Sequence, residues 1–196
     1  MADNCADRLC GGRSRCDYCL QEAADRRRCK ARRVRRDSAA PVELKTGSYS
    51  FVSGYKDAAT VEVSINYDPA RFGFAVVEDG FPAYSGDSHV AVVYGEDFTA
   101  QLEYAGYYHG ESFAAMSEAA GAKFGGFGEV AFGSLHGIRY IDGDCICMCF
   151  PIPGDDYSYL LVTVIKAEGN DDTLDELQEN KDLADILGRL EISSGR

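Results

Sequence analysis

The sequence predicts an α+β protein with an antiparallel sheet of about six to eight strands, flanked by two main helices and preceded by a basic, cysteine-rich arm. Short stretches that alternate apolar and polar residues are separated by turns too brief to hold a crossover helix, which argues against a parallel sheet. Two longer stretches have helical composition. The 196 residues fit one domain plus a short appendage, because a domain takes roughly 100–200 residues.

The first half of the predicted sheet consists of two hairpins. Residues 60–67 alternate apolar and polar side chains, which is the pattern of a strand with one face on a core and the other in water. A short turn leads to a second extended segment, residues 72–77, and we expect the two segments to pair. Residues 89–94 and 98–104 are expected to form another hairpin around the turn Gly95–Asp97.

The second half begins with a helix and continues as a meander. Residues 111–124 are rich in alanine and are followed by the glycine-rich run 125–128, so we expect a helix that ends there and packs closely on the sheet. Gly and Asp turns then separate four further strands. These strands are expected at residues 129–133, 137–141, 145–151 and 157–166.

The last helix has the clearest start signal in the chain. Thr173 and Glu176 have the spacing of a capping box, in which each side chain bonds to the backbone N–H of the other residue. Apolar and small residues then follow near a seven-residue rhythm, at Leu174, Leu177, Ala184 and Leu187. We expect one acidic helix there that closes the domain.

Charge divides the chain into two parts. Residues 1–37 hold 11 of the 20 Lys and Arg but 6 of the 32 Asp and Glu, a net charge of +5, which leaves −17 for residues 38–196. Residues 38–47 contain Pro41 and lack a clear period, which is typical of a connection. We therefore predict an arm over residues 1–40 and a domain over residues 41–196.

Five cysteines lie in the arm, and their spacing suggests a zinc site. Cys16 and Cys19 form a C-x2-C knuckle, which supplies two thiolates where a structural zinc needs four ligands. Cys29 with Cys10 or Cys5 would complete the tetrahedron, although the loop between Cys10 and Cys16 is short for a zinc ribbon. The alternative is an arm without a fixed structure, whose thiols are exposed.

The arm ends in a strongly basic run, Arg26–Arg36, with eight basic residues in eleven and no acid. Such a run identifies a positive potential rather than a particular partner. Nucleic acid, an anionic membrane surface and the acidic domain of the same chain are its candidate counterparts. A solvated tail, or a segment added by an upstream start codon, is the interpretation without function.

The remaining three cysteines lie in one predicted strand. Cys145, Cys147 and Cys149 alternate with Ile146 and Met148, so their sulfurs share one face of the strand. Same-face neighbours are roughly 6.5–7 Å apart, too far for two thiolates on one zinc in a straight strand. We expect a central strand covered on both faces, with the cysteines packed as small apolar residues.

Part of the domain resembles PsbP-like domains. The segment Val63–Phe72 is similar to the family's opening strand and its Tyr-Pro turn, and Ile186–Ser193 is similar to its closing segment. The resemblance covers residues 60–193 and implies a helix-flanked antiparallel sheet. It also implies a binding or assembly factor without a catalytic residue common to the family.

The predicted function is therefore that of a noncatalytic binding module whose acidic surface selects a basic or cationic protein partner. A zinc-binding regulator that contacts nucleic acid through its arm is the alternative, and an enzyme ranks third. We expect no cofactor under the first interpretation. No apolar run reaches the roughly 20 residues of a membrane span and the N-terminus lacks a signal-peptide pattern, so we expect a cytoplasmic protein.

Overall fold

A computed structural model describes residues 42–52, 60–78, 89–106 and 112–195. Residues Glu43–Arg196 form one compact unit. Its described part is an α+β fold dominated by antiparallel sheet, as predicted, with ten strands and three helices. The predicted arm lies outside the described residues, and the boundary near Pro41 stays a prediction.

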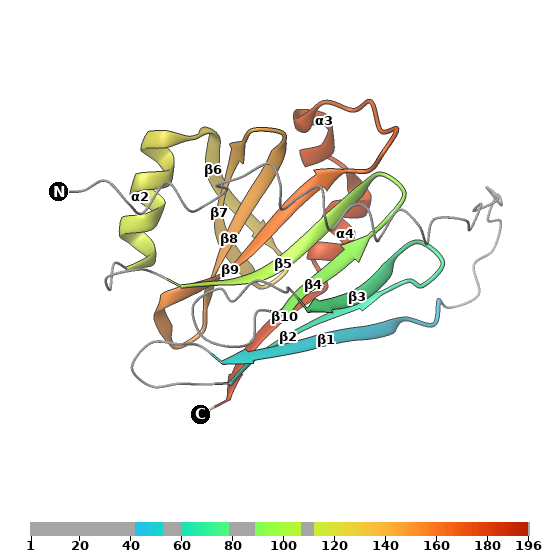
Figure 1. Ribbon diagram of the computed structural model, residues 1–196, viewed down its shortest axis with the longest axis horizontal. Coiled ribbons are helices and arrows are strands. Elements are labelled where there is room, and N and C mark those ends of the chain that lie inside the picture. Colours follow the sequence, from blue (N-terminus) through green and yellow to red (C-terminus); the bar gives the residue numbers. More distant parts are fainter. Residues whose placement is uncertain (1–41, 53–59, 79–88, 107–111, 196) are drawn as a thin grey trace. The chain divides into compact units, whose positions relative to one another are not determined.

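The larger of two sheets has seven strands, all antiparallel to their neighbours (Figure 1). Its predicted second hairpin and its meander are both present. In sheet order the strands are β3 (Gly73–Glu78), β4 (His89–Tyr94), β5 (Phe98–Gly106), β9 (Asp155–Lys166), β8 (Cys145–Ile152), β7 (Leu135–Asp142) and β6 (Gly125–Phe132).

The smaller sheet has three strands and corrects the predicted first hairpin. It consists of β1 (Lys45–Val52), β2 (Thr60–Tyr67) and β10 (Leu190–Gly195), with β2 in the middle. The strand predicted at residues 60–67 therefore pairs with β1 and β10, whereas β3 pairs with β4 in the other sheet. Both edges of β2 are already occupied, so the turn after it carries the chain from one sheet to the other.

Neither partner of β2 was predicted as a strand. In β1 the inward positions include Gly47, where a Cβ atom would lie 2.3 Å from the Phe74 ring. A glycine is needed for this close approach, and it hides the period-two pattern within the predicted connection 38–47. In β10, Leu190 is buried and is paired with Ile65 of β2, although the segment was expected to close the last helix.

The helices are α2 (Phe113–Lys123), α3 (Leu174–Gln178) and α4 (Lys181–Leu187). The capping box of Thr173 and Glu176 is confirmed. The single final helix was wrong, because the Asn180 side chain accepts hydrogen bonds from the backbone N–H of Asp182 and Leu183 and so starts a second helix. The seven-residue spacing of apolar residues continues across this break, so it did not indicate that a second helix begins there.

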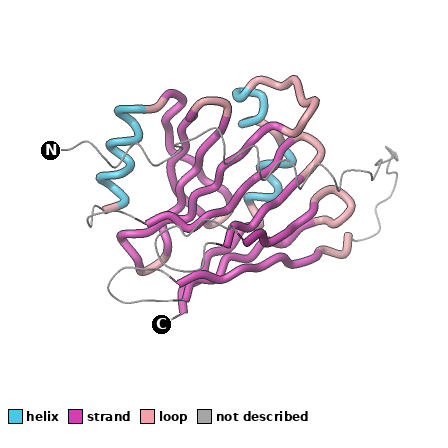
Figure 2. The backbone as a smooth tube through the Cα atoms, viewed as in Figure 1, coloured by secondary structure: helices cyan, strands magenta, loops and turns pink. Residues whose placement is uncertain are grey.

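Different elements cover the two faces of the larger sheet (Figure 2). We call the face that packs against the smaller sheet, α3 and α4 the core face. Its strands contribute large buried side chains such as Phe98, Phe150 and Leu160, which pack in one cluster with Ile65 of β2 and Leu183 of α4. We call the opposite face, on which α2 lies, the helix face.

The cysteines of β8 point to the helix face. Cys147 and Cys149 have no exposed area, and Ile146 and Met148 on the core face are also buried. The predicted strand with two covered faces is thus confirmed for these two cysteines. Cys145 is half-buried, because it begins the strand directly after a turn, where less of the structure surrounds it.

Candidate binding groove

Helix α2 covers the helix face near β6, β7 and β9. Ser112 caps its N-terminus, where the hydroxyl oxygen accepts a hydrogen bond from the backbone N–H of Ala115 at 3.3 Å. Met116 and Ala120 are the buried residues of the helix. The small side chain of Ala120 permits the close packing on the sheet that the alanine-rich sequence predicted.

Two aromatic contacts hold the ends of α2 on the sheet. The ring of Phe113 meets Tyr159 of β9 edge-on, with 6.3 Å between ring centroids. At the other end the ring of Phe124 stacks on Tyr140 of β7, with centroids 4.6 Å apart. Lys123 places its ammonium 5.0 Å from the Phe124 ring centroid. Ring contacts at both ends of the helix therefore add to the packing of its buried residues Met116 and Ala120.

Between α2 and the strands β6 and β7 lies an open groove with a volume of about 950 Å³. The groove is open to solvent rather than enclosed, so this volume describes a surface depression and not a cavity. Apolar atoms dominate the lining. They come from Phe113 and Ala114 of α2, from Phe127, Val130 and Ala131 of β6, and from Ile138 of β7.

Phe127 forms an apolar wall of the groove. Its side chain is 41% exposed, which is unusual for a phenyl ring. A Cβ atom at Gly121 would lie 3.2 Å from this ring, so the glycine lets the ring rest against the helix. The groove thus offers an aromatic surface that nothing in the described residues covers completely.

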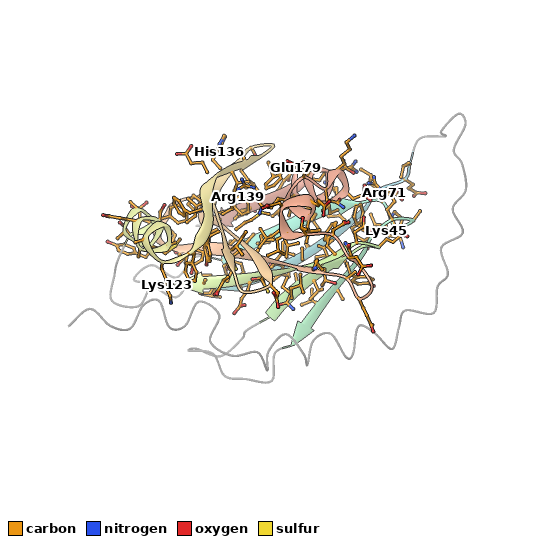
Figure 3. All side chains as sticks on the ribbon, turned by 90° about the horizontal axis from the view of Figure 1, so that it is seen from above. Lys45, Arg71, Lys123, His136, Arg139 and Glu179 are labelled. Carbon is orange, nitrogen blue, oxygen red and sulfur yellow. The ribbon has the colours of Figure 1, made fainter. Side chains whose placement is uncertain are left out.

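The charged lining of the groove is negative. Glu118 of α2 and Glu129 of β6 line it and are exposed, and His136 of β7 is the remaining titratable residue. Of the described residues that line the groove, none is Lys or Arg. In Figure 3, Lys123 is labelled below the ribbon and His136 above it, both in the left half of the view. Among the described residues, the groove therefore combines apolar surface with two carboxylates and no Lys or Arg in its lining, which suits a positive charge on a ligand.

Two titratable groups outside the groove have shifted pKa values. Burial, reinforced by the negative charge of Glu103, raises the pKa of Tyr49, whose hydroxyl donates to the carbonyl oxygen of Leu102 at 3.2 Å. Hydrogen bonds from the backbone N–H and the hydroxyl of Thr173 lower the pKa of Glu176. Both shifts arise from structural contacts, in the core and at a helix start.

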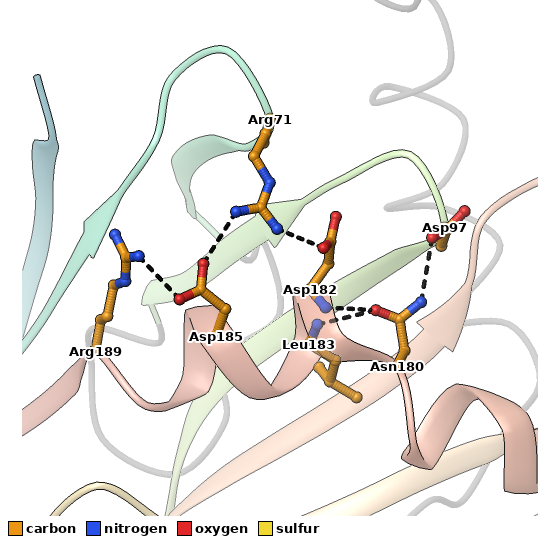
Figure 4. A network of polar contacts seen from close by, with 7 residues as sticks. All are labelled: Arg71, Asp97, Asn180, Asp182, Leu183, Asp185 and Arg189. Carbon is orange, nitrogen blue, oxygen red and sulfur yellow. Dashed lines mark hydrogen bonds and ion pairs between the residues drawn. The ribbon is translucent and has the colours of Figure 1, made fainter. Parts of the chain in front are cut away.

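A polar network on the opposite side of the sheet is structural as well (Figure 4). Arg71, in the turn after β2, forms ion pairs with Asp182 and with Asp185, the latter at 3.1 Å. Arg189 bonds to the other oxygen of Asp185 at 2.8 Å. Asn180 donates from Nδ2 to Asp97 in the turn between β4 and β5 at 3.1 Å. These contacts fasten α4 to both sheets.

The metal-ligand candidates singled out from the sequence do not fall among the residues that the structure describes. Cys10, Cys16, Cys19 and Cys29 lie outside the described residues, as does the basic run Arg26–Arg36, so the zinc site stays a prediction. Among the residues that the structure describes, no group of three or more His, Cys, Asp or Glu is arranged to hold a metal ion.

The sequence also predicts that five aromatic residues gather around the first helix, as an edge of the core or as a docking surface: Tyr104, Tyr107, Tyr108, Phe124 and Phe127. The described residues show only part of this cluster. Phe124 and Phe127 do contact α2 or its end. Tyr104 does not, because its ring packs at a tilt of 41° against Phe51 of the smaller sheet, with centroids 4.8 Å apart. Tyr107 and Tyr108, also expected in this cluster, lie outside the described residues. The strand alternation of β5 decides this, since it directs Tyr104 to the core face.

Sequence reasoning missed Glu118 and Glu129. His136 stands beside a predicted turn and belongs to no metal or general-base motif, so the sequence predicts only a surface or turn histidine there. The three belong to α2, β6 and β7 and share no motif. The available signal was the direct succession of a small-residue helix and a glycine-rich strand, residues 113–132, which predicts close packing but not a groove.

Comparison with protein-family models, with curated protein sequences and with solved structures yields no match to this chain. The resemblance to PsbP-like domains thus stays an expectation drawn from the quoted residues. None of the helices in the described ranges has the length and apolar character needed to cross a membrane.

Proposed function

We propose that this protein is a noncatalytic binding or assembly module, PsbP-like in kind, which recognises a basic segment of a protein partner in the groove between α2, β6 and β7. The observation that carries this proposal is the combination of an open apolar groove of about 950 Å³ with the carboxylates Glu118 and Glu129 on its walls.

Charge on two scales supports a cationic partner. Residues 38–196 carry a net charge of −17, which attracts a basic protein over distances of about a Debye length, roughly 8 Å at physiological salt. Within the groove, Glu118 and Glu129 then select positive side chains at close range. The exposed ring of Phe127 supplies apolar and cation–π contact.

The groove also has the composition of a recognition surface. Interface cores favour aromatic residues. When a partner removes mainly apolar atoms from water, their burial contributes favourably to the free energy of binding. Phe113 and Phe127 are the aromatic members of the lining. The proposal therefore needs no chemical step and rests on contact area and charge.

Binding of a fluorescein-labelled peptide to the full chain tests the proposal. We define the lysine peptide as Thr-Val-Lys-Val-Lys-Val-Thr and the glutamate peptide as the same sequence with Glu in place of Lys. Fluorescence anisotropy should show that the lysine peptide binds at least about tenfold more tightly, and that its affinity falls as salt rises. Equal affinities for the two peptides would contradict the proposal.

A double variant locates the site. Glu118→Gln with Glu129→Gln should weaken binding of the lysine peptide by about tenfold, because two nearby carboxylates are lost. Glu62→Gln with Glu191→Gln removes the same charge from exposed positions of the smaller sheet and is the matched control. If both double variants weaken binding equally, the groove is not the site and only the overall charge acts.

A further inference from the structure

The strand β6, which forms one wall of the groove, is also an edge of the seven-stranded sheet. Within the described part of the chain it pairs with β7 alone. Alternate residues of an antiparallel strand direct their N–H and C=O groups away from the paired neighbour, so β6 presents a row of these groups at the sheet edge. An edge of this kind is a template for another strand.

The sequence of β6 does little to block such pairing. Lys and Pro often protect exposed edges, and Gly125–Phe132 contains neither. A register irregularity lies between Gly125 and Gly128, after which each residue through Phe132 pairs in regular register with β7. The last five residues of β6 are therefore a regular edge, directly beside the groove.

We propose, building on the proposed function, that the partner binds by strand addition: an extended basic segment pairs through its backbone with residues 128–132 of β6. Main-chain hydrogen bonds then supply affinity, and the alternating side chains of the segment supply specificity. Glu129, Val130 and Ala131 line the groove, and the side chains of Val130 and Phe132 also pack against the core cluster.

This alternation specifies the sequence of the segment. Directly opposed side chains of neighbouring strands lie about 4.5–5.5 Å apart at Cβ. A Lys or Arg opposite Glu129 would form a cross-strand ion pair on the groove side. Apolar residues on either side of it would extend the apolar contact of Val130 and Phe132. The expected ligand thus alternates basic and apolar residues, as the lysine peptide does.

Charge disfavours a second copy of this chain as the occupant. Pairing of two β6 edges would bring Glu129, and Glu118 beside it, toward the same acidic groups of the other copy. The whole chain carries −12, so the two copies also repel each other at longer range. A basic partner meets neither penalty.

A backbone methylation scan of the lysine peptide tests the mode of binding to the full-length protein. In an added strand, the N–H groups of one alternate set of residues face β6 and those of the other set face water. N-methylation of the Val set and of the Lys set should therefore have unequal effects. We expect at least about a tenfold loss for one set and at most about a twofold loss for the other.

A charge reversal tests the register position. Glu129→Lys should lower the affinity for the lysine peptide and raise the affinity for the glutamate peptide, each by about tenfold. The reason is that like charges opposed across strands repel and opposite charges attract. Glu62→Lys, on the exposed face of β2, is the matched control and should change neither affinity by more than about twofold. Far-UV circular dichroism of both variants checks that the fold is retained.

The outcomes separate this inference from the proposed function. If the lysine peptide binds in the groove but both methylated sets bind equally well or equally poorly, strand addition is wrong and side-chain docking stands. If the lysine peptide fails to bind better than the glutamate peptide, both proposals fail. If sedimentation shows a dimer that Glu129→Lys abolishes, the edge belongs to a second copy and the inference is overturned.

Discussion

The core face and the helix face of the seven-stranded sheet are built in contrasting ways. On the core face, a second sheet and two capped helices pack against large apolar side chains, and ion pairs from Arg71 fasten α4 in place. On the helix face, one helix with alanine, serine and glycine on its open sides is held by ring contacts at its ends. The first arrangement buries the larger apolar core, and the second leaves an open groove, where we propose that a partner binds.

The contrast also appears in the phenyl rings of the two faces. Phe150 of β8 is fully buried on the core face, where it meets Phe132 with ring centroids 6.3 Å apart. Phe127 of β6 is 41% exposed beside the groove. The ring of Phe150 is withdrawn from water, whereas the ring of Phe127 stays partly in contact with it. We therefore expect Phe150 to contribute to stability and Phe127 to contribute to binding.

The largest expected effect follows from replacing these two rings. Phe150→Ala should lower the free energy of unfolding by about 3–5 kcal/mol, because it removes buried apolar contact and leaves a cavity. Phe127→Ala should lower the free energy of unfolding by less than about 1 kcal/mol, but it should reduce the affinity for the lysine peptide. Urea unfolding measures both losses, and similar values for the two variants would refute the contrast.

The next effect concerns the start of α4. Asn180→Ala should destabilise the protein by about 1–2 kcal/mol, because Asn180 caps two backbone N–H groups and also bonds to Asp97. Asn66→Ala is the control, since Asn66 makes one exposed side-chain bond to Thr46 and should cost less. Thermal unfolding compares the two, and an equal cost would show that the cap contributes little to the covering of the core face.

A smaller effect is expected at the start of α3 and depends on pH. Thr173→Ala should cost about 1 kcal/mol, and it should raise the pKa of Glu176, which the backbone N–H and hydroxyl of Thr173 lower. A carboxyl whose pKa is lowered on folding adds stability above its unfolded pKa, roughly 4.3 for Glu, and that stability is lost as pH falls further. The variant should therefore lose less stability than the parent on acidification. NMR titration of the Glu176 carboxyl checks the direction of the shift, and an unchanged pKa would contradict it.

The smallest effect is expected from the exposed ion pairs. Arg71→Gln removes the pairs with Asp182 and Asp185, whose side chains are about as exposed as that of Arg71. Partly exposed pairs contribute roughly 0–1 kcal/mol, and less at high salt. Urea unfolding at low and at high salt measures this, and a loss well above 1 kcal/mol would place Arg71 among the main supports of the core face.

Local patterns succeeded where one short segment carries the information. The alternation of residues 60–67 predicted β2 with the bounds that the structure has. The capping box of Thr173 and Glu176 predicted the start of α3. These features depend on neighbours within a few residues, so they can be recognised without knowledge of the tertiary fold.

Patterns failed where distant packing overrides them. Gly47 occupies an inward position of β1 only because the Phe74 ring approaches it, and this contact joins two sheets. Asn180 divides the final helix by capping α4 and bonding to Asp97, a residue 83 positions away in the chain. Neither contact leaves a periodic mark in the sequence.

By itself, the sequence determined the class of the fold, most strand segments, the meander, the cap at Thr173 and the acidic charge of residues 38–196, because periodicity, turn residues and charge are local or additive. Only the tertiary structure decided that β2 pairs with β1 and β10, that Phe127 stays exposed, and that Glu118 and Glu129 share a groove. The physical reason is that strand pairing and the seating of α2 depend on which surfaces fit together across long stretches of chain, where many pairings satisfy the same local pattern.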